Sequence, residues 1–200
     1  MRKNLRARKL IERLNDKIQR RLDLDETLIL GVVLKGLPVA YGLARMNKII
    51  DNFVPLVAQR HIYMQHQVES YFPSSEWKGY FGQQLQGLKS LLIVDDVVNT
   101  GFTRQRVEGV VHSLDARNGG DHAFAALVLN CRNLANPRFV ETNDFYALKA
   151  NAEEVECDWG QITVPLWNLS VKEARERCEE YYLKYWVHET RFVSLTYVDQ

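Results

Sequence analysis

The stretch that most constrains the fold of this chain is Leu-Leu-Ile-Val-Asp-Asp-Val-Val-Asn-Thr-Gly-Phe-Thr, residues 91–103. Its first four residues form an unbroken apolar run, which is typical of a strand buried on both faces. Two adjacent carboxylates, Asp95 and Asp96, follow the run directly. Farther along, apolar residues recur with helical period at Val107, Val110, Val111 and Leu114. The polar residues of 91–103 therefore lie between a strand and a helix, where open α/β sheets bind ligands.

Two further apolar runs have the same character. Residues 28–34 read Leu-Ile-Leu-Gly-Val-Val-Leu and precede a helical pattern from Pro38 to Met46, and residues 122–131 form another apolar run. Buried strands that alternate with helices predict a parallel sheet covered on both sides. We therefore expect one α/β domain over residues 1–200, with a mostly parallel sheet, helices on both faces, and Leu91–Val94 as a central strand.

Both ends of the chain also have regular patterns. Residues 170–187 have the period of an amphipathic helix, and residues 191–198 alternate as a short strand. Residues 2–22 predict a basic amphipathic helix whose apolar stripe docks on the core or on a second subunit. Its basic face is either a solvated surface or a contact for nucleic acid or a membrane surface. The stripe consists of Leu10, Ile11, Leu14, Ile18 and Leu22.

The composition narrows the class of protein. The formal net charge is +1, so the chain as a whole is not drawn to nucleic acid or membranes. Its three cysteines, Cys131, Cys157 and Cys178, lie far apart without a CxxC pair, which argues against a zinc site or a disulfide scaffold. No apolar run approaches the length of a transmembrane helix, and the basic N-terminus lacks the apolar segment of a signal peptide. We expect a cytoplasmic protein without a membrane span.

The polar residues of 91–103 have a defined chemistry. The loop 99–103 can offer backbone N–H groups, two hydroxyl groups and the start of a helix to one phosphate. Asp95 and Asp96 can accept hydrogen bonds from sugar hydroxyls or face a hydrated cation. The alternative is a core strand that ends in a solvated acidic turn, but adjacent carboxylates after a buried run are costly unless they are used.

This pattern resembles the signature with which type I phosphoribosyltransferases bind 5-phosphoribosyl-1-pyrophosphate (PRPP): an apolar run, two acidic and two apolar residues, one variable position, then Thr-Gly-x-Thr. The resemblance implies that Asp95 and Asp96 act in catalysis, hold the ribose hydroxyls and reach Mg²⁺ through water. It also implies that the 5′-phosphate is bound by Asn99, Thr100, Gly101, Phe102 and Thr103.

The resemblance extends to other segments and is nearest to hypoxanthine- and xanthine-type enzymes. Lys35-Gly36 resembles the pyrophosphate-binding loop, with Lys35 also catalytic. Residues 65–86 stand where the family has a mobile covering loop. Ser70-Tyr71 resembles a Ser-Tyr pair of that loop, so Tyr71 is either a catalytic residue or an ordinary apolar packing residue. We thus expect an N-terminal helix at 1–22, a PRPP-binding core at 24–131, and a hood with a C-terminal helix and strand at 132–200, the last forty residues having no clear counterpart in the family. Trp159 is either the residue that stacks on the base or a buried tryptophan of the hood.

One position departs from the 6-oxopurine enzymes: Asn99, which the resemblance also places at the base, stands where those enzymes have aspartate. An amide cannot act as a general base near neutral pH. The first hypothesis is therefore a pentosyltransferase that joins a nucleobase to PRPP with Mg²⁺, as in purine salvage, and forms a homodimer or larger homo-oligomer. The second is a non-catalytic PRPP-binding regulator, with nucleic acid as a partner of the N-terminal helix. The third is an α/β binding module whose match to the signature is accidental.

Overall fold

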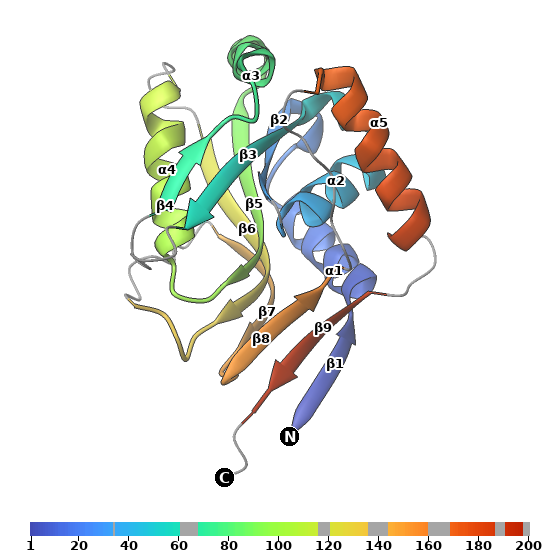
Figure 1. Ribbon diagram of the computed structural model, residues 1–200, viewed down its shortest axis with the longest axis vertical. Coiled ribbons are helices and arrows are strands. Elements are labelled where there is room, and N and C mark those ends of the chain that lie inside the picture. The colour runs from blue at the N-terminus through green and yellow to red at the C-terminus, as the bar shows by residue number, and fades with distance from the viewer. Residues whose placement is uncertain are drawn as a thin grey trace.

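The computed structural model describes residues 1–33, 35–60, 68–115, 121–135, 144–159, 169–186 and 191–197. Within these ranges, the side chains of residues 59–60, 68–71 and 185–186 lie outside the description. Figure 1 shows a large sheet flanked by helices and, below it, a small sheet to which both ends of the chain contribute. Among the helices that the structure describes, none combines the length and the apolar character needed to cross a bilayer.

The large sheet has six strands in the order β4-β3-β2-β5-β6-β7. Five of them are parallel, and β4 pairs antiparallel with β3 at one edge. The predicted mostly parallel sheet is confirmed, and so is the central place of Leu91–Val94, because β5 lies between β2 and β6. The strands are β2 Thr27–Val33, β3 Phe53–Arg60, β4 Val68–Tyr71, β5 Ser90–Val98, β6 Asp121–Asn130 and β7 Phe145–Ala150.

Helices cover both faces of this sheet (Figure 1). Along the strand order of the sheet, the connection from β2 to β3 runs toward the β4 edge, whereas those from β3 to β5 and from β5 to β6 run toward the β7 edge. Because such crossovers are right-handed, α2 covers the face opposite to α3 and α4. α1 lies beside α2, and α5 packs outside α2, where Glu179 accepts from the Tyr41 hydroxyl at 2.5 Å and from Arg45 Nε at 3.1 Å. The helices are α1 Ala7–Gln19, α2 Leu37–Met46, α3 Ser75–Gly87, α4 Phe102–Leu114 and α5 Val171–Tyr181, with a π-helical turn at Tyr182–Trp186.

The core lies on both sides of the central strands. All seven residues of β2 are buried, which explains why its sequence is apolar without alternation. The apolar stripe of α1 is buried as well, at 0–6% exposure for Leu10, Ile11, Leu14 and Ile18. Burial of side chains of this size contributes about 1.5–3 kcal/mol each. The stripe therefore docks on the core of its own chain.

The small sheet joins the two ends of the chain in the order β1-β9-β8, with antiparallel pairs throughout. Its strands are β1 Arg2–Arg6, β9 Phe192–Thr196 and β8 Glu154–Asp158, and we call this sheet the hood. The prediction of a helix over all of residues 2–22 is wrong for residues 2–6. Arg2–Arg6 lacks an apolar face to bury against the core, and pairing with β9 supplies the backbone hydrogen bonds instead. The hood is therefore not a C-terminal lobe alone.

The stretch 65–86 also differs from expectation. In place of a long irregular loop, the structure has β4 and then α3, while residues 61–67 lie outside the described residues. α3 buries Trp77, Phe81 and Leu85, at 0–4% exposure and four residues apart. Glycine and glutamine between these residues dilute the helical pattern, so the sequence did not reveal it.

Candidate active site

A cavity of about 380 Å³ opens at the carboxyl ends of β2 and β5. This is the edge at which parallel α/β sheets bind ligands. The hood closes its opposite side, through side chains of β8. The polar residues that line the cavity are Lys35 after β2, Asp95, Asp96 and Asn99 from β5 and its loop, and Thr103 from α4. The hood contributes Val155 and Cys157 from β8.

The acidic pair lies at the end of β5, with Asp95 only 7% and Asp96 only 5% exposed. Oδ1 of Asp95 accepts the backbone N–H of Asp96 at 2.8 Å, and Oδ1 of Asp96 accepts that of Val97 at 2.8 Å. Oδ2 of Asp96 accepts Nε1 of Trp159 at 3.3 Å. These donors fix both carboxylates in position at the cavity wall.

The loop after β2 packs directly against the acidic pair. A Cβ atom on Gly36 would lie 2.7 Å from both the Cα of Asp95 and the carbonyl oxygen of Val94. Because these are backbone atoms of β5, only glycine allows this close approach. The structure therefore brings together Lys35, Gly36 and the acidic pair, which lie some sixty residues apart in the sequence.

The loop between β5 and α4 has the form of an anion site. Gly101 adopts a left-handed backbone conformation with φ 88°, and α4 begins directly after it. The hydroxyl of Thr100 is buried and has no hydrogen-bond partner among the described residues. Phe102 and Thr103 form the first turn of α4, where the helix dipole favours a negative charge. Backbone donors, a helix start and a covered hydroxyl together suit a phosphate.

Asn99 is held by two neighbouring amides. Its Oδ1 accepts Nδ2 of Asn130 at 3.1 Å and Nδ2 of Asn133 at 3.0 Å. Asn133 also donates to the carbonyl oxygen of Glu153 at 3.3 Å, and this bond fixes which end of its amide is the donor. Asn99 therefore keeps its Nδ2 as the group that can donate at the cavity. No pattern in the sequence indicates the roles of Asn130 and Asn133.

The hood contributes residues that the sequence interpretation missed. Val155 and Cys157 line the cavity, and Trp159 follows at the same two-residue spacing, an alternation that could have indicated one strand face. Burial raises the pKa of the Cys157 thiol, and the negative charge of the neighbouring Asp96 raises it further. Trp159 is 3% exposed, and the Tyr181 hydroxyl donates to its carbonyl oxygen. The indole thus bonds Asp96 in this structure, and stacking on a base stays a prediction.

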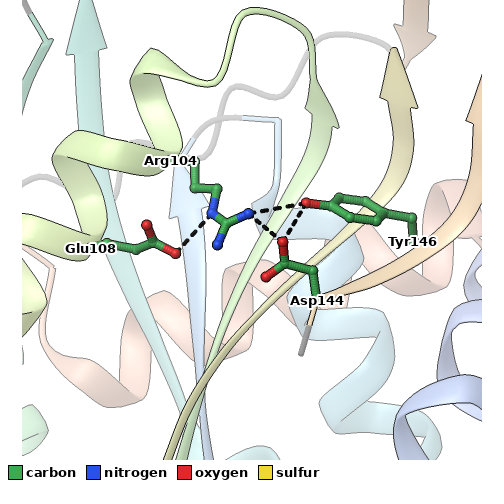
Figure 2. Close-up of polar contacts among 4 residues, drawn as sticks. All are labelled: Arg104, Glu108, Asp144 and Tyr146. Carbon is green, nitrogen blue, oxygen red and sulfur yellow. Dashed lines mark hydrogen bonds and ion pairs between the residues drawn. The ribbon is translucent and has the colours of Figure 1, made fainter. Parts of the chain in front are cut away.

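A buried charged cluster anchors the start of α4 (Figure 2). The Arg104 guanidinium donates to Asp144, to the hydroxyl of Tyr146 at 3.3 Å and, through Nε, to Glu108 at 2.8 Å. It also lies over the ring of Phe124. Burial alone would lower the pKa of Arg104, but the two carboxylates outweigh it and raise the pKa. The cluster ties the helix that follows the phosphate-type loop to the chain entering β7.

Tyr71 lies at the end of β4, where its backbone pairs with Val57. Its side chain lies outside the described residues, so its catalytic role stays a prediction.

Comparison with known proteins rests on structure alone. No family model and no curated protein matches the sequence. A hypothetical protein from Neisseria gonorrhoeae with bound ppGpp matches with TM-score 0.54 and 16% identity, over 72% of this chain and 78% of its own. A hypoxanthine-guanine phosphoribosyltransferase from Bacillus anthracis matches with TM-score 0.53 and 13% identity, over 76% and 84%. A hypoxanthine phosphoribosyltransferase from Staphylococcus aureus matches with TM-score 0.50 and 14% identity, over 74% and 75%. This chain therefore has the type I phosphoribosyltransferase fold.

Proposed function

We propose that this protein binds PRPP with Mg²⁺ and transfers its ribose 5-phosphate to a nucleobase, releasing pyrophosphate. One observation carries the proposal: a buried acidic pair, a glycine-opened helix start and the loop at Lys35-Gly36 meet at one cavity. A ligand with a sugar diol, a phosphate on one side and a second charged group on the other needs those three elements.

Each element has a proposed partner on PRPP. The loop 99–103 holds the 5′-phosphate, with the unpartnered hydroxyl of Thr100 as one donor. Asp95 and Asp96 accept hydrogen bonds from the ribose hydroxyls. Lys35 and the backbone at Gly36 meet the pyrophosphate, which an ammonium group attracts as a point charge.

The residues present fit Mg²⁺ as an ion shared with the substrate. Mg²⁺ typically takes one or two carboxylates together with substrate phosphates and water, and the cavity offers Asp95 and Asp96. Among the described parts of the chain, no three His, Cys, Asp or Glu side chains gather to hold a metal ion by themselves. Asp95 and Asp96 would hold Mg²⁺ through water, and the ion, when bound, would neutralise charge on the leaving pyrophosphate.

The proposed reaction is a displacement at the anomeric carbon. A ring nitrogen of the base forms the new C–N bond, and the C–O bond to pyrophosphate breaks with its electron pair leaving on oxygen. The proton that the base loses passes to water or to the leaving pyrophosphate. The transition state has oxocarbenium character, as in glycoside hydrolysis. The chain contributes alignment, through the diol and phosphate contacts, and the hood residues Val155 and Cys157 keep water from the cavity.

A second candidate is a protein that binds PRPP or a related nucleotide without catalysis. The orientation of Asn99 favours it, because Oδ1 already accepts two amide donors and the remaining group can only donate. A donor cannot take a proton from the base. The similar protein from Neisseria gonorrhoeae carries bound ppGpp, so the same fold binds a nucleotide in that case.

A pyrophosphate-release assay with PRPP, Mg²⁺ and a panel of purine and pyrimidine bases separates the two candidates. We expect turnover with at least one base, and poor turnover of hypoxanthine and guanine. Asn99→Asp keeps the acceptor for Asn130 and Asn133 and restores a base, so 6-oxopurine turnover should rise by about 10²-fold. PRPP binding without turnover of any base, in both forms, would support the regulator and exclude the transferase.

A further inference from the structure

The charge of this protein is distributed very unevenly along the chain. Residues 1–21 contain nine lysine and arginine residues against Glu12 and Asp16, a net charge of +7. The whole chain has a net charge of +1, which leaves −6 for residues 22–200. The near-neutral total therefore conceals a strongly basic segment, which comprises β1 and α1 and the two residues after α1.

Three of the four cations of α1, together with Arg20 directly after it, share one face, while Arg8 pairs with Glu12. Lys9, Arg13, Lys17 and Arg20 follow one another at spacings of four, four and three residues, which places them along one side of a helix. Lys9, Arg13 and Arg20 are exposed, and the ammonium of Lys17 donates to the carbonyl oxygen of Tyr146 at 2.5 Å. Burial lowers the pKa of Lys17, and the nearby positive charges of Arg13 and Lys149 lower it further. Lys149 lies on β7, so this strand places a fifth cation beside the other four. We call these five residues the basic face: Lys9, Arg13, Lys17, Arg20 and Lys149.

The fold does not use most of these charges. Among the described residues, no carboxylate lies within ion-pair distance of Lys9, Arg13, Arg20 or Lys149. The cations of α5 differ, since Lys172 pairs with Glu176 at 4.0 Å and Arg177 with Glu180 at 3.1 Å. Asp16 is the carboxylate of α1 on the same side, and the five cations outnumber it. The basic face therefore keeps a net positive charge, which favours an anionic partner.

We propose that the basic face binds the phosphodiester backbone of nucleic acid. From Lys9 to Arg20 the helix rises about 16 Å, which spans roughly five phosphates of one strand. A regular row of cations on a rigid helix matches a regular row of phosphates. A membrane surface fits less well, because an interfacial helix must insert its apolar face, and that of α1 is buried in the core at 0–6% exposure. None of the five residues lines the cavity, so both ligands can bind together.

The test is fluorescence anisotropy with a labelled oligouridylate of about 20 nucleotides, titrated at several salt concentrations. Neutralising Lys9→Gln, Arg13→Gln and Arg20→Gln together should weaken binding at least tenfold near 0.1 M salt. The slope of log affinity against log salt should become shallower by about 2, because each phosphate contact on a single strand contributes about 0.7. A control variant, Lys78→Gln, Lys172→Gln and Arg177→Gln, removes equal charge from exposed positions on α3 and α5 and should bind within about twofold of the unaltered protein.

Three results would overturn the proposal: no binding by the unaltered protein, equal losses in the two triple variants, or face-dependent binding to anionic lipid vesicles without binding to the oligonucleotide. Should the triple variant unfold, Arg13→Gln alone should still make the slope shallower by about 0.7. PRPP affinity is measured in parallel, and we expect it to be unchanged in both triple variants. The result of this test is therefore independent of the proposed function.

Discussion

The two walls of the cavity are built in different ways. The core wall comes from the loop after β2 and from β5 and its loop, where neighbouring residues in the sequence supply Asp95, Asp96 and Asn99. The hood wall comes from β8, which is held through β9 by the N-terminal strand β1. The candidate functional residues of the core wall can be recognised from one stretch of sequence. Those of the hood wall reach the cavity only because strands from both ends of the chain pair with each other.

The walls also differ in what holds them. The core wall rests on buried charges and close backbone contacts, at Arg104 and Gly36. The hood wall meets the core wall at Asp96, to which the indole of Trp159 donates a hydrogen bond. A ligand that binds Asp96 competes with this donor. We therefore expect the core wall to set stability and ligand affinity, and the hood wall to yield when a ligand enters.

The largest effect is expected at the anchor of the core wall. Asp144→Asn removes a carboxylate from a pair in which both side chains are 2% exposed, and leaves Arg104 with Glu108 alone. The loss should be about 3 kcal/mol of unfolding free energy in urea denaturation. The control is Glu26→Gln, whose pair with Lys89 is exposed to solvent, so its loss should change the unfolding free energy far less. Equal effects of the two changes would contradict the importance of the buried cluster.

A somewhat smaller effect is expected at the loop contact. Gly36→Ala puts a methyl group against the backbone of β5 and should cost about 2 kcal/mol, with a clear loss of PRPP affinity. Gly82→Ala on α3 meets open space and should instead stabilise the protein by about 0.5–1 kcal/mol. If Gly36→Ala retains full stability and affinity by calorimetry, the loop does not lie against Asp95.

On the hood wall the effect should be smaller and different in kind. Trp159→Phe keeps an aromatic ring but removes the donor to Asp96, which should cost about 1.5 kcal/mol of stability. PRPP affinity should stay the same or rise, since Asp96 loses a competitor. A tenfold loss of PRPP affinity would show instead that Trp159 binds the ligand directly.

The smallest effect concerns pH. Burial raises the pKa of Cys178 to about 12, from an ordinary value of 9.0, and raises that of Cys157 as well. A thiol whose pKa is raised by folding leaves the free energy of unfolding at its full value well below pH 9. This free energy falls as the pH rises through 9, because the thiol then ionises in the unfolded state but not in the folded state. Each thiol should thus cost about 0.4 kcal/mol of unfolding free energy between pH 8 and pH 9. Denaturation of Cys178→Ala should have a shallower dependence over this range, and an unchanged one would contradict the burial effect.

The core wall was predictable from the sequence to a larger extent than the hood wall. The strand at Leu91–Val94 and its acidic pair were predictable because an apolar run and a polar turn are local signals. The strand at Arg2–Arg6 was not, because nothing within those five residues indicates a partner nearly 190 residues away. The roles of Asn130 and Asn133 could not be predicted for the same reason, since only the fold brings these residues to Asn99. The helix at 75–87 escaped because glycine and glutamine separate its three buried residues.

Calorimetric titration of PRPP with Mg²⁺ into the unaltered protein and into Asp95→Asn/Asp96→Asn tests the central claim most directly. Charge-assisted hydrogen bonds contribute roughly 1.5–3 kcal/mol each, so the double variant should bind PRPP at least tenfold more weakly. The backbone N–H groups that Asp95 and Asp96 accept can still bond the amide oxygens, and a thermal melt checks that the fold is retained. Unchanged PRPP affinity in a folded double variant would contradict the assignment of this cavity to PRPP.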